Sequence, residues 1–159
     1  MAKTTKKLSK TQFGAQIRNL HGAILDIMSV INRPERDELL IKEAAIPLER
    51  ALFPLLVVID KFGPIGIGDL AGRVGRDYTT VSRHVARLES IGLVVRKPGA
   101  KDRRITETAT TPQGKVMTAA VDAARERLGR RILKNWESGE VDDLIRLVRK
   151  FADAMKGAT

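Results

Sequence analysis

The chain contains no cysteine among its 159 residues, and only two histidines. Without cysteine, disulfide bonds, thiolate metal sites and thiol redox sensing are all excluded. His21 and His84 lie far apart in the sequence, and neither has a carboxylate and a nucleophile nearby in a catalytic arrangement. The composition therefore predicts no catalytic residue, no metal site and no cofactor.

Long apolar runs are missing as well. The longest, from Ala51 to Ile59, is far shorter than the roughly 20 residues that a membrane-spanning helix needs. The N-terminus is basic but lacks the apolar region of a signal peptide. The glycine-rich stretch at residues 63–68 lacks the Lys-Ser/Thr pair of a phosphate-binding loop, so it is interpreted as a turn. These absences predict a cytoplasmic protein with no membrane contact.

Positive charge, by contrast, is abundant. Lysine and arginine number 29 against 19 acidic residues, which gives a formal net charge of +10. From Arg73 to Arg104 there are nine basic residues and only three acidic ones. A basic excess of this kind indicates a polyanionic partner, and nucleic acid is favoured over acidic lipid.

The basic region also carries a recognisable order of elements. A short helix is expected from Ile67 to Val74, followed by a tight turn at Gly75 and a second helix opening at Asp77. Two short β-prone runs follow, Leu93 to Lys97 and Ile105 to Thr110, and they enclose the basic loop PGAKDRR. Helix, turn, helix and basic hairpin together predict a winged helix-turn-helix that binds duplex DNA.

The second helix has two distinct faces. A rotation of about 100° per residue directs one stripe toward the core, namely Tyr78, Val81, Val85 and Leu88. Asp77 is suited to cap the helix N-terminus. Short hydroxyl side chains near that end allow close approach to DNA, and an arginine can pair with guanine O6 and N7. The predicted DNA-binding residues of this helix are Thr79, Thr80, Arg83, His84 and Arg87. On an isolated helix a solvated face would explain them better, but the hairpin that follows favours DNA.

The basic loop supplies the remaining predicted DNA contacts, Lys101, Asp102, Arg103 and Arg104. Pro98 and Gly99 are expected to end the first strand. Asp102 can form a local ion pair that holds the Arg104 guanidinium extended, as entry into a narrow minor groove requires. Since exposed ion pairs stabilise little, the predicted role of Asp102 is orientation. Lys101 and Arg103 are predicted to contact phosphates.

The run LAGRVGRDYTTVSRHVARLESIGLVVR, followed by DRRITETATTPQG, resembles the MarR family of bacterial transcriptional regulators. Asp102 and Arg104 match the family's D-x-R wing motif, and Thr111 and Gly114 match the Thr and Gly of its L-T-x-x-G motif. Thr110 stands where the family usually has Leu, which is expected to weaken anchoring of the second wing strand. The L-E-x-x-G-L turn is matched by Leu88, Glu89, Gly92 and Leu93.

Apolar residues at helical spacing extend into both flanks. The first stripe, in a helix that Pro34 should end, comprises Phe13, Ile17, Leu20, Ile24, Ile27 or Met28, and Ile31. Thr111 can cap a helix that has Pro112 at its first position, with a stripe of Val116, Met117, Ala120, Val121, Ala124, Leu128 and Ile132. A last helix after Ser138-Gly139 has Val141, Leu144, Ile145, Val148, Phe151, Ala152 and Met155. The resemblance implies that the terminal helices interlock into a homodimer; the alternative is a monomer that folds them onto its own core.

The predicted fold is mainly α with a small β-hairpin wing. It comprises a flexible basic tail (1–10), N-terminal helices contributing to dimerisation (11–45), a winged helix-turn-helix DNA-binding domain (46–111) and C-terminal dimerisation helices (112–159). Within the DNA-binding domain (46–111), residues 51–60 should form a buried helix. Pro54 either kinks that helix or lies in its first turn.

The predicted function is a homodimeric, sequence-specific transcriptional regulator, a repressor that binds double-stranded DNA at a palindromic operator. The resemblance further implies a small-molecule effector, bound between the DNA-binding lobe and the dimer helices, that changes the spacing of the recognition helices. Two alternatives stay open. One is a regulator that needs no ligand, and the other is an architectural winged-helix protein whose charge serves largely non-specific DNA binding.

Overall fold

The computed structural model describes residues 9–158. Its elements are α1 (Lys10–Ile31), α2 (Pro34–Ala44), α3 (Phe53–Phe62), β1 (Ile65–Gly66), α4 (Ile67–Val74), α5 (Tyr78–Ser90), β2 (Val94–Pro98), β3 (Thr106–Thr110), α6 (Pro112–Ile132) and α7 (Ser138–Gly157). The predicted fold class, mainly α with a small β wing, is confirmed. Of the predicted N-terminal tail, residues 1–8 lie outside the described part, and Ser9 caps α1.

Helix starts coincide with the capping residues that the sequence offers. The Asp77 carboxylate accepts a hydrogen bond from the Thr80 backbone N–H at 2.8 Å, which opens α5. The Thr111 hydroxyl accepts one from the Gly114 N–H at 3.1 Å, which opens α6. Pro54 lies in the first turn of α3, where a missing N–H costs nothing, so this helix needs no kink there.

The three strands form one antiparallel sheet in the order β1-β3-β2. Strands β2 and β3 are the predicted hairpin, with Val94 opposite Thr110 and Pro98 opposite Thr106. Pro98 is therefore the last residue of its strand, and the break comes after it. The glycine-rich stretch, expected to form a turn, also contains β1, whose Ile65 pairs with Thr108. That pairing anchors the base of the wing beside the start of α4.

The core lies in the lobe built by α3, α4, α5 and the sheet. Its largest fully buried apolar side chains are Leu52, Leu55, Leu56, Ile59, Leu70, Val81, Val85, Leu88, Leu93 and Val121. Of the predicted buried helix at residues 51–60, residues 53–60 are helical, and Phe53, Leu55, Leu56 and Ile59 of that helix are buried. The prediction that Tyr78 faces the core is wrong, because its side chain is 61% exposed. As the first residue of α5, Tyr78 lies beyond the apolar cover and lines an open groove between α4 and the wing.

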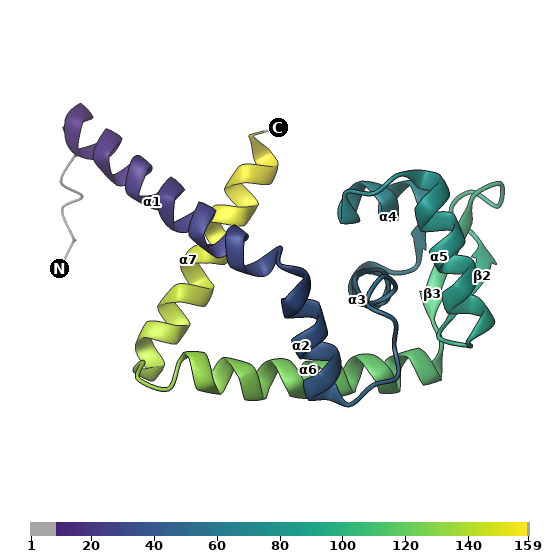
Figure 1. Cartoon of the computed structure of the whole chain (residues 1–159). Helices are drawn as coiled ribbons and strands as arrows, with labels where there is room; N and C mark the ends of the chain where they lie inside the picture. Colours follow the sequence, from purple (N-terminus) through teal and green to yellow (C-terminus); the bar gives the residue numbers. More distant parts are fainter. Residues whose placement is uncertain (1–8, 159) are drawn as a thin grey trace.

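The long helix α6 extends from the sheet, beneath α2, to the connection with α7 (Figure 1). Its Val121, Ala124 and Leu128 are buried as the stripe predicts, whereas Val116 and Ile132 on that stripe are exposed. Helices α1 and α7 lie away from the lobe (Figure 1), and neither contains a buried residue. No helix within residues 9–158 is long and apolar enough to cross a membrane.

Candidate DNA-binding surface

The turn between α4 and α5 fixes the angle at which α5 is presented. Gly75 ends α4 in the left-handed region, with φ of 65°, a conformation that glycine adopts without strain. The Arg76 guanidinium then donates a 2.8 Å hydrogen bond to the Ala51 carbonyl, at the approach to α3. Arg76 belongs to the basic excess of the sequence, yet its contact here is within the lobe.

Helix α5 turns its polar face outward because the opposite face is locked in the core. Val81, Val85 and Leu88 are fully buried. Thr79, Arg83 and Arg87 are exposed, and Thr80 and His84 are half-buried. The structure thus brings the five predicted DNA-binding residues of this helix together on its outer face and flanks. Within residues 9–158, Arg83 takes part in no hydrogen bond or ion pair.

Arg87 differs from Arg83 because it has an acidic neighbour. Its Nη2 lies 3.5 Å from Oε1 of Glu49, in the segment between α2 and α3, and both side chains are more than half exposed. A pair this long and this exposed adds little stability. It does, however, hold a carboxylate at the edge of the candidate surface, where it would repel phosphate. Glu49 was not predicted, because 38 residues separate it from Arg87.

His84 packs at the flank of α5. Its Nδ1 is buried and has no hydrogen-bond partner within the described residues. Burial lowers the pKa of His84 below its ordinary value of 6.5, and the nearby Arg76 and Arg83 charges lower the pKa further. The imidazole is therefore neutral at pH 7 in the free protein, where it can donate or accept a hydrogen bond.

The tip of the wing is organised around Asp102. Its carboxylate accepts three hydrogen bonds from Arg104, from the backbone N–H at 3.0 Å, from Nε at 3.1 Å and from Nη2 at 3.0 Å. The side-chain hydrogen bond from Arg104 is the main reason that the pKa of Asp102 is lowered. Arg104 nevertheless stays 91% exposed, so the pair orients the guanidinium without burying it. The predicted ion pair forms, and Lys101 and Arg103 lie exposed beside it.

Backbone contacts close the same loop. The Gly99 N–H donates to the Ile105 carbonyl at 2.7 Å, and the Ile105 N–H donates to the Asp102 carbonyl at 3.1 Å. A Cβ at Gly99 would lie 2.7 Å from the Asp102 carbonyl oxygen, so the loop needs glycine at this position. The loop that carries Asp102 and Arg104 is therefore shaped by its own backbone.

Other basic residues of the region support the lobe. The Arg96 Nε lies 3.1 Å from a carboxylate oxygen of Glu89, and the Arg96 N–H donates to the other oxygen at 3.3 Å, which ties β2 to α5. The Arg73 guanidinium stacks over the Phe62 ring at 4.1 Å from its centroid. Within residues 9–158, the positive charges of Arg96 and Arg73 thus have partners inside the lobe, unlike that of Arg83 on the outer face of α5.

An outward-facing helix in a helix-turn-helix, next to a wing tipped by an oriented arginine, defines a winged helix-turn-helix DNA-binding protein. The MarR family pattern matches residues 48–106. An uncharacterised HTH-type transcriptional regulator of Bacillus subtilis, YxaD, is 31% identical over 107 residues, which are 67% of this chain and 75% of the relative. The HTH-type transcriptional repressor MdtR of the same organism is 27% identical over 122 residues, 77% of each chain.

Solved structures show the same fold. The transcriptional regulator BldR of Sulfolobus solfataricus is 24% identical with a TM-score of 0.65, over 92% of this chain and 99% of that one. A MarR transcriptional regulator of Methanosarcina mazei Go1 is 17% identical with a TM-score of 0.69, over 87% of this chain and 99% of that one. The chain belongs to the MarR family of DNA-binding transcriptional regulators. The family membership that the sequence resemblance indicates is thus confirmed.

Proposed function

We propose that the chain acts as a homodimer whose two winged lobes bind the half-sites of an inverted-repeat operator and repress transcription by occupying it. The observation that carries the proposal is the pair of apolar faces on α1 and α7. These faces are exposed at Phe13, Ile17, Leu20, Ile27, Met28, Ile31, Leu144, Ile145, Val148, Phe151 and Met155. Burying one such side chain contributes roughly 1.5–3 kcal/mol, so a second copy that covers these faces is strongly favoured.

A two-fold dimer has a direct consequence for the operator. Two α5 helices related by a two-fold axis fit an inverted repeat, with half-site centres on the order of 10 bp apart. In each half-site Arg83 reads a base in the major groove, with Thr79 and Thr80 allowing close approach. His84 and Arg87 contact the edges of the same major groove. Arg104, oriented by Asp102, enters the minor groove, while Lys101 and Arg103 contact phosphates.

Repression is the simplest outcome for such a dimer, since occupying promoter DNA excludes other proteins. The similarity to MdtR, whose name describes a transcriptional repressor, supports this direction of regulation. Release by a small-molecule effector stays a prediction from the family resemblance.

Sedimentation and footprinting test the dimer. The Val148→Asp variant places a carboxylate on the apolar face of α7. The control Lys150→Asp places a carboxylate on the opposite face of that helix and also removes a positive charge, so it is the larger change in charge. We expect Val148→Asp to sediment as a monomer and to lose protection of the inverted repeat, and Lys150→Asp to retain both. A monomeric wild-type chain that protects a full palindrome contradicts the dimer.

A salt titration tests sequence specificity. Wild-type protein should bind a duplex selected from a random-sequence pool far more tightly than an unselected duplex of equal length. Nearly equal affinities with similar salt slopes would instead indicate the architectural alternative.

A further inference from the structure

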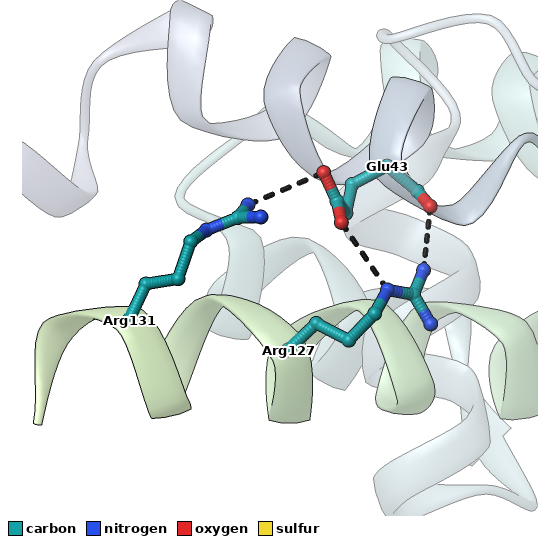
Figure 2. Close-up of polar contacts among 3 residues, drawn as sticks. All are labelled: Glu43, Arg127 and Arg131. Atoms are coloured by element: carbon teal, nitrogen blue, oxygen red, sulfur yellow. Dashed lines mark hydrogen bonds and ion pairs between the residues drawn. The ribbon is translucent and has the colours of Figure 1, made fainter. Parts of the chain in front are cut away.

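One carboxylate joins α2 to α6. Glu43, in the last turn of α2, accepts a hydrogen bond from Arg127 Nε at 3.2 Å through one oxygen, and one from Arg131 Nη2 at 3.2 Å through the other. Arg127 Nη2 also donates to the Glu43 backbone carbonyl at 2.6 Å. Figure 2 shows the two arginines rising from α6 on either side of this carboxylate.

The cluster satisfies groups that would otherwise lack partners. Carbonyls in the last turn of a helix have no intrahelical donor, and Arg127 supplies one at the C-terminus of α2. Ala45, the C-cap residue of α2, has φ of 53° and turns the chain toward the lobe. The hydrogen bonds from Arg127 and Arg131 lower the pKa of Glu43, so the carboxylate is ionised at neutral pH. Charge-assisted contacts of this kind are directional.

The place of Glu43 in the chain gives these contacts a mechanical role. The amphipathic helices α1 and α7 are connected to the lobe by two routes. Helix α1 is connected through α2, and α7 is connected through α6. Leu40, Ile41 and Ala44 of α2 pack against the core cluster, as does Met117 of α6. Apolar packing is non-directional, so it permits small sliding and rotation of one helix on the other. The contacts of Glu43 with Arg127 and Arg131 are directional, so they fix the position of α2 along and around α6.

We propose that Glu43 is a positioning residue that locks α2 against α6 and thereby sets the separation of the two recognition helices in the dimer. This inference rests on the proposed dimer. It assigns Glu43 no contact with DNA, because its partners are all in the connection between the lobe and the terminal helices.

Because the chain lacks cysteine, an Ala86→Cys parent carries one nitroxide label on each α5, and pulsed electron resonance measures the distance between them. Glu43→Gln in this parent removes the carboxylate charge but keeps the size of the side chain. The matched control is Glu126→Gln, which removes the same charge from an ion pair with Arg130 contained within α6. We expect Glu43→Gln to broaden the distance distribution and Glu126→Gln to leave it unchanged.

A second readout uses an inverted repeat selected by the wild-type chain, with one or two base pairs inserted between its half-sites. Wild-type protein and Glu126→Gln should lose affinity on each insertion, whereas Glu43→Gln should lose much less of its affinity. Melting temperatures of the variants report whether each is folded. If Glu43→Gln is poorly folded, Arg131→Gln, which leaves the Arg127 cap on α2 in place, should broaden the distribution instead.

The outcomes separate the two proposals. A narrow distribution in Glu43→Gln, with spacing dependence like that of wild type, overturns the role of Glu43 and leaves the dimer standing. Equal broadening in Glu43→Gln and Glu126→Gln also overturns it, because charge alone would then be responsible. No dipolar signal in the Ala86→Cys parent shows that there is no dimer, which refutes the proposed function and this inference together.

Discussion

Substituting Gly114 with alanine should separate α6 from the wing. An ideal Cβ at this position would lie 2.1 Å from the Leu93 carbonyl oxygen and 3.2 Å from the Leu93 carbonyl carbon. Close carbon–oxygen contacts are about 3.3 Å, so the two backbones must move apart by about 1 Å. The same Leu93 carbonyl accepts the Thr111 N–H at 3.0 Å. The Thr111 hydroxyl donates to the Gly92 carbonyl at 2.6 Å. Moving the two backbones apart would strain both hydrogen bonds.

The loss in the free energy of unfolding can be estimated from these contacts. Overpacking a tight site costs roughly 1–3 kcal/mol, and two weakened hydrogen bonds add roughly 0.5–1.5 kcal/mol each. The free energy of unfolding should therefore fall by about 2–6 kcal/mol, which for a chain of this size lowers Tm by about 10 °C. Thermal unfolding followed by circular dichroism measures this fall. Protein concentration must be matched between samples, because the Tm of a dimer depends on it.

Gly72 provides the matched control. It lies in α4, and beyond its neighbours in the chain and the backbone of its own helix no atom lies within 4 Å of its ideal Cβ. Gly72→Ala should therefore stabilise the protein by roughly 0.5–1 kcal/mol, through the lower entropy of the unfolded chain. The same chemical change is thus predicted to act in opposite directions at the two sites. If Gly114→Ala melts like wild type, the close approach of α6 to Leu93 does not require glycine at position 114.

Four further substitutions test the candidate surface. Arg83→Ala should cost ~1–3 kcal/mol on the selected duplex and relax base preference at one position, and unchanged affinity rejects Arg83 as a base reader. Arg104→Ala should weaken binding to that duplex strongly and Asp102→Ala less so, by freeing the guanidinium; a harmless Asp102→Ala contradicts its orienting role. Glu49→Gln should tighten binding to random duplex at low salt, because it releases Arg87 and removes a negative charge beside the phosphates. Glu126→Gln is its charge-matched control, and an equal gain in both variants shows that the position of Glu49 has no special effect.

Local chemistry explains why so many element boundaries could be predicted from the sequence. Capping by Asp77 and Thr111 involves residues three apart, so the signal lies within a single turn. The left-handed turn at Gly75 is a similarly local requirement. The pairing of β1 with β3 is different, because Ile65 meets a residue far along the chain. A two-residue strand offers no periodicity from which that partner could be predicted.

Periodicity gives the angular position of a side chain but not the extent of what covers it. Tyr78 has the same helical phase as Val81 and Val85, yet it is exposed because the lobe does not extend over the first residue of α5. The stripes of α1 and α7 show the same limit on a larger scale. Their apolar spacing was predicted, but they are uncovered within the described chain.

The basic residues of the lobe divide between affinity and specificity. Arg76 donates to a carbonyl and Arg73 stacks over an aromatic ring, so neither contact neutralises the positive charge. Both charges can still attract phosphates over the distance that salt allows. Specific reading needs a side chain that is free to meet a base edge or is held ready for a groove. On α5 that description fits Arg83, which is exposed and forms no hydrogen bond or ion pair within residues 9–158, and on the wing it fits Arg104. Sequence preference should therefore depend on few side chains, while salt-dependent affinity is spread over the whole lobe.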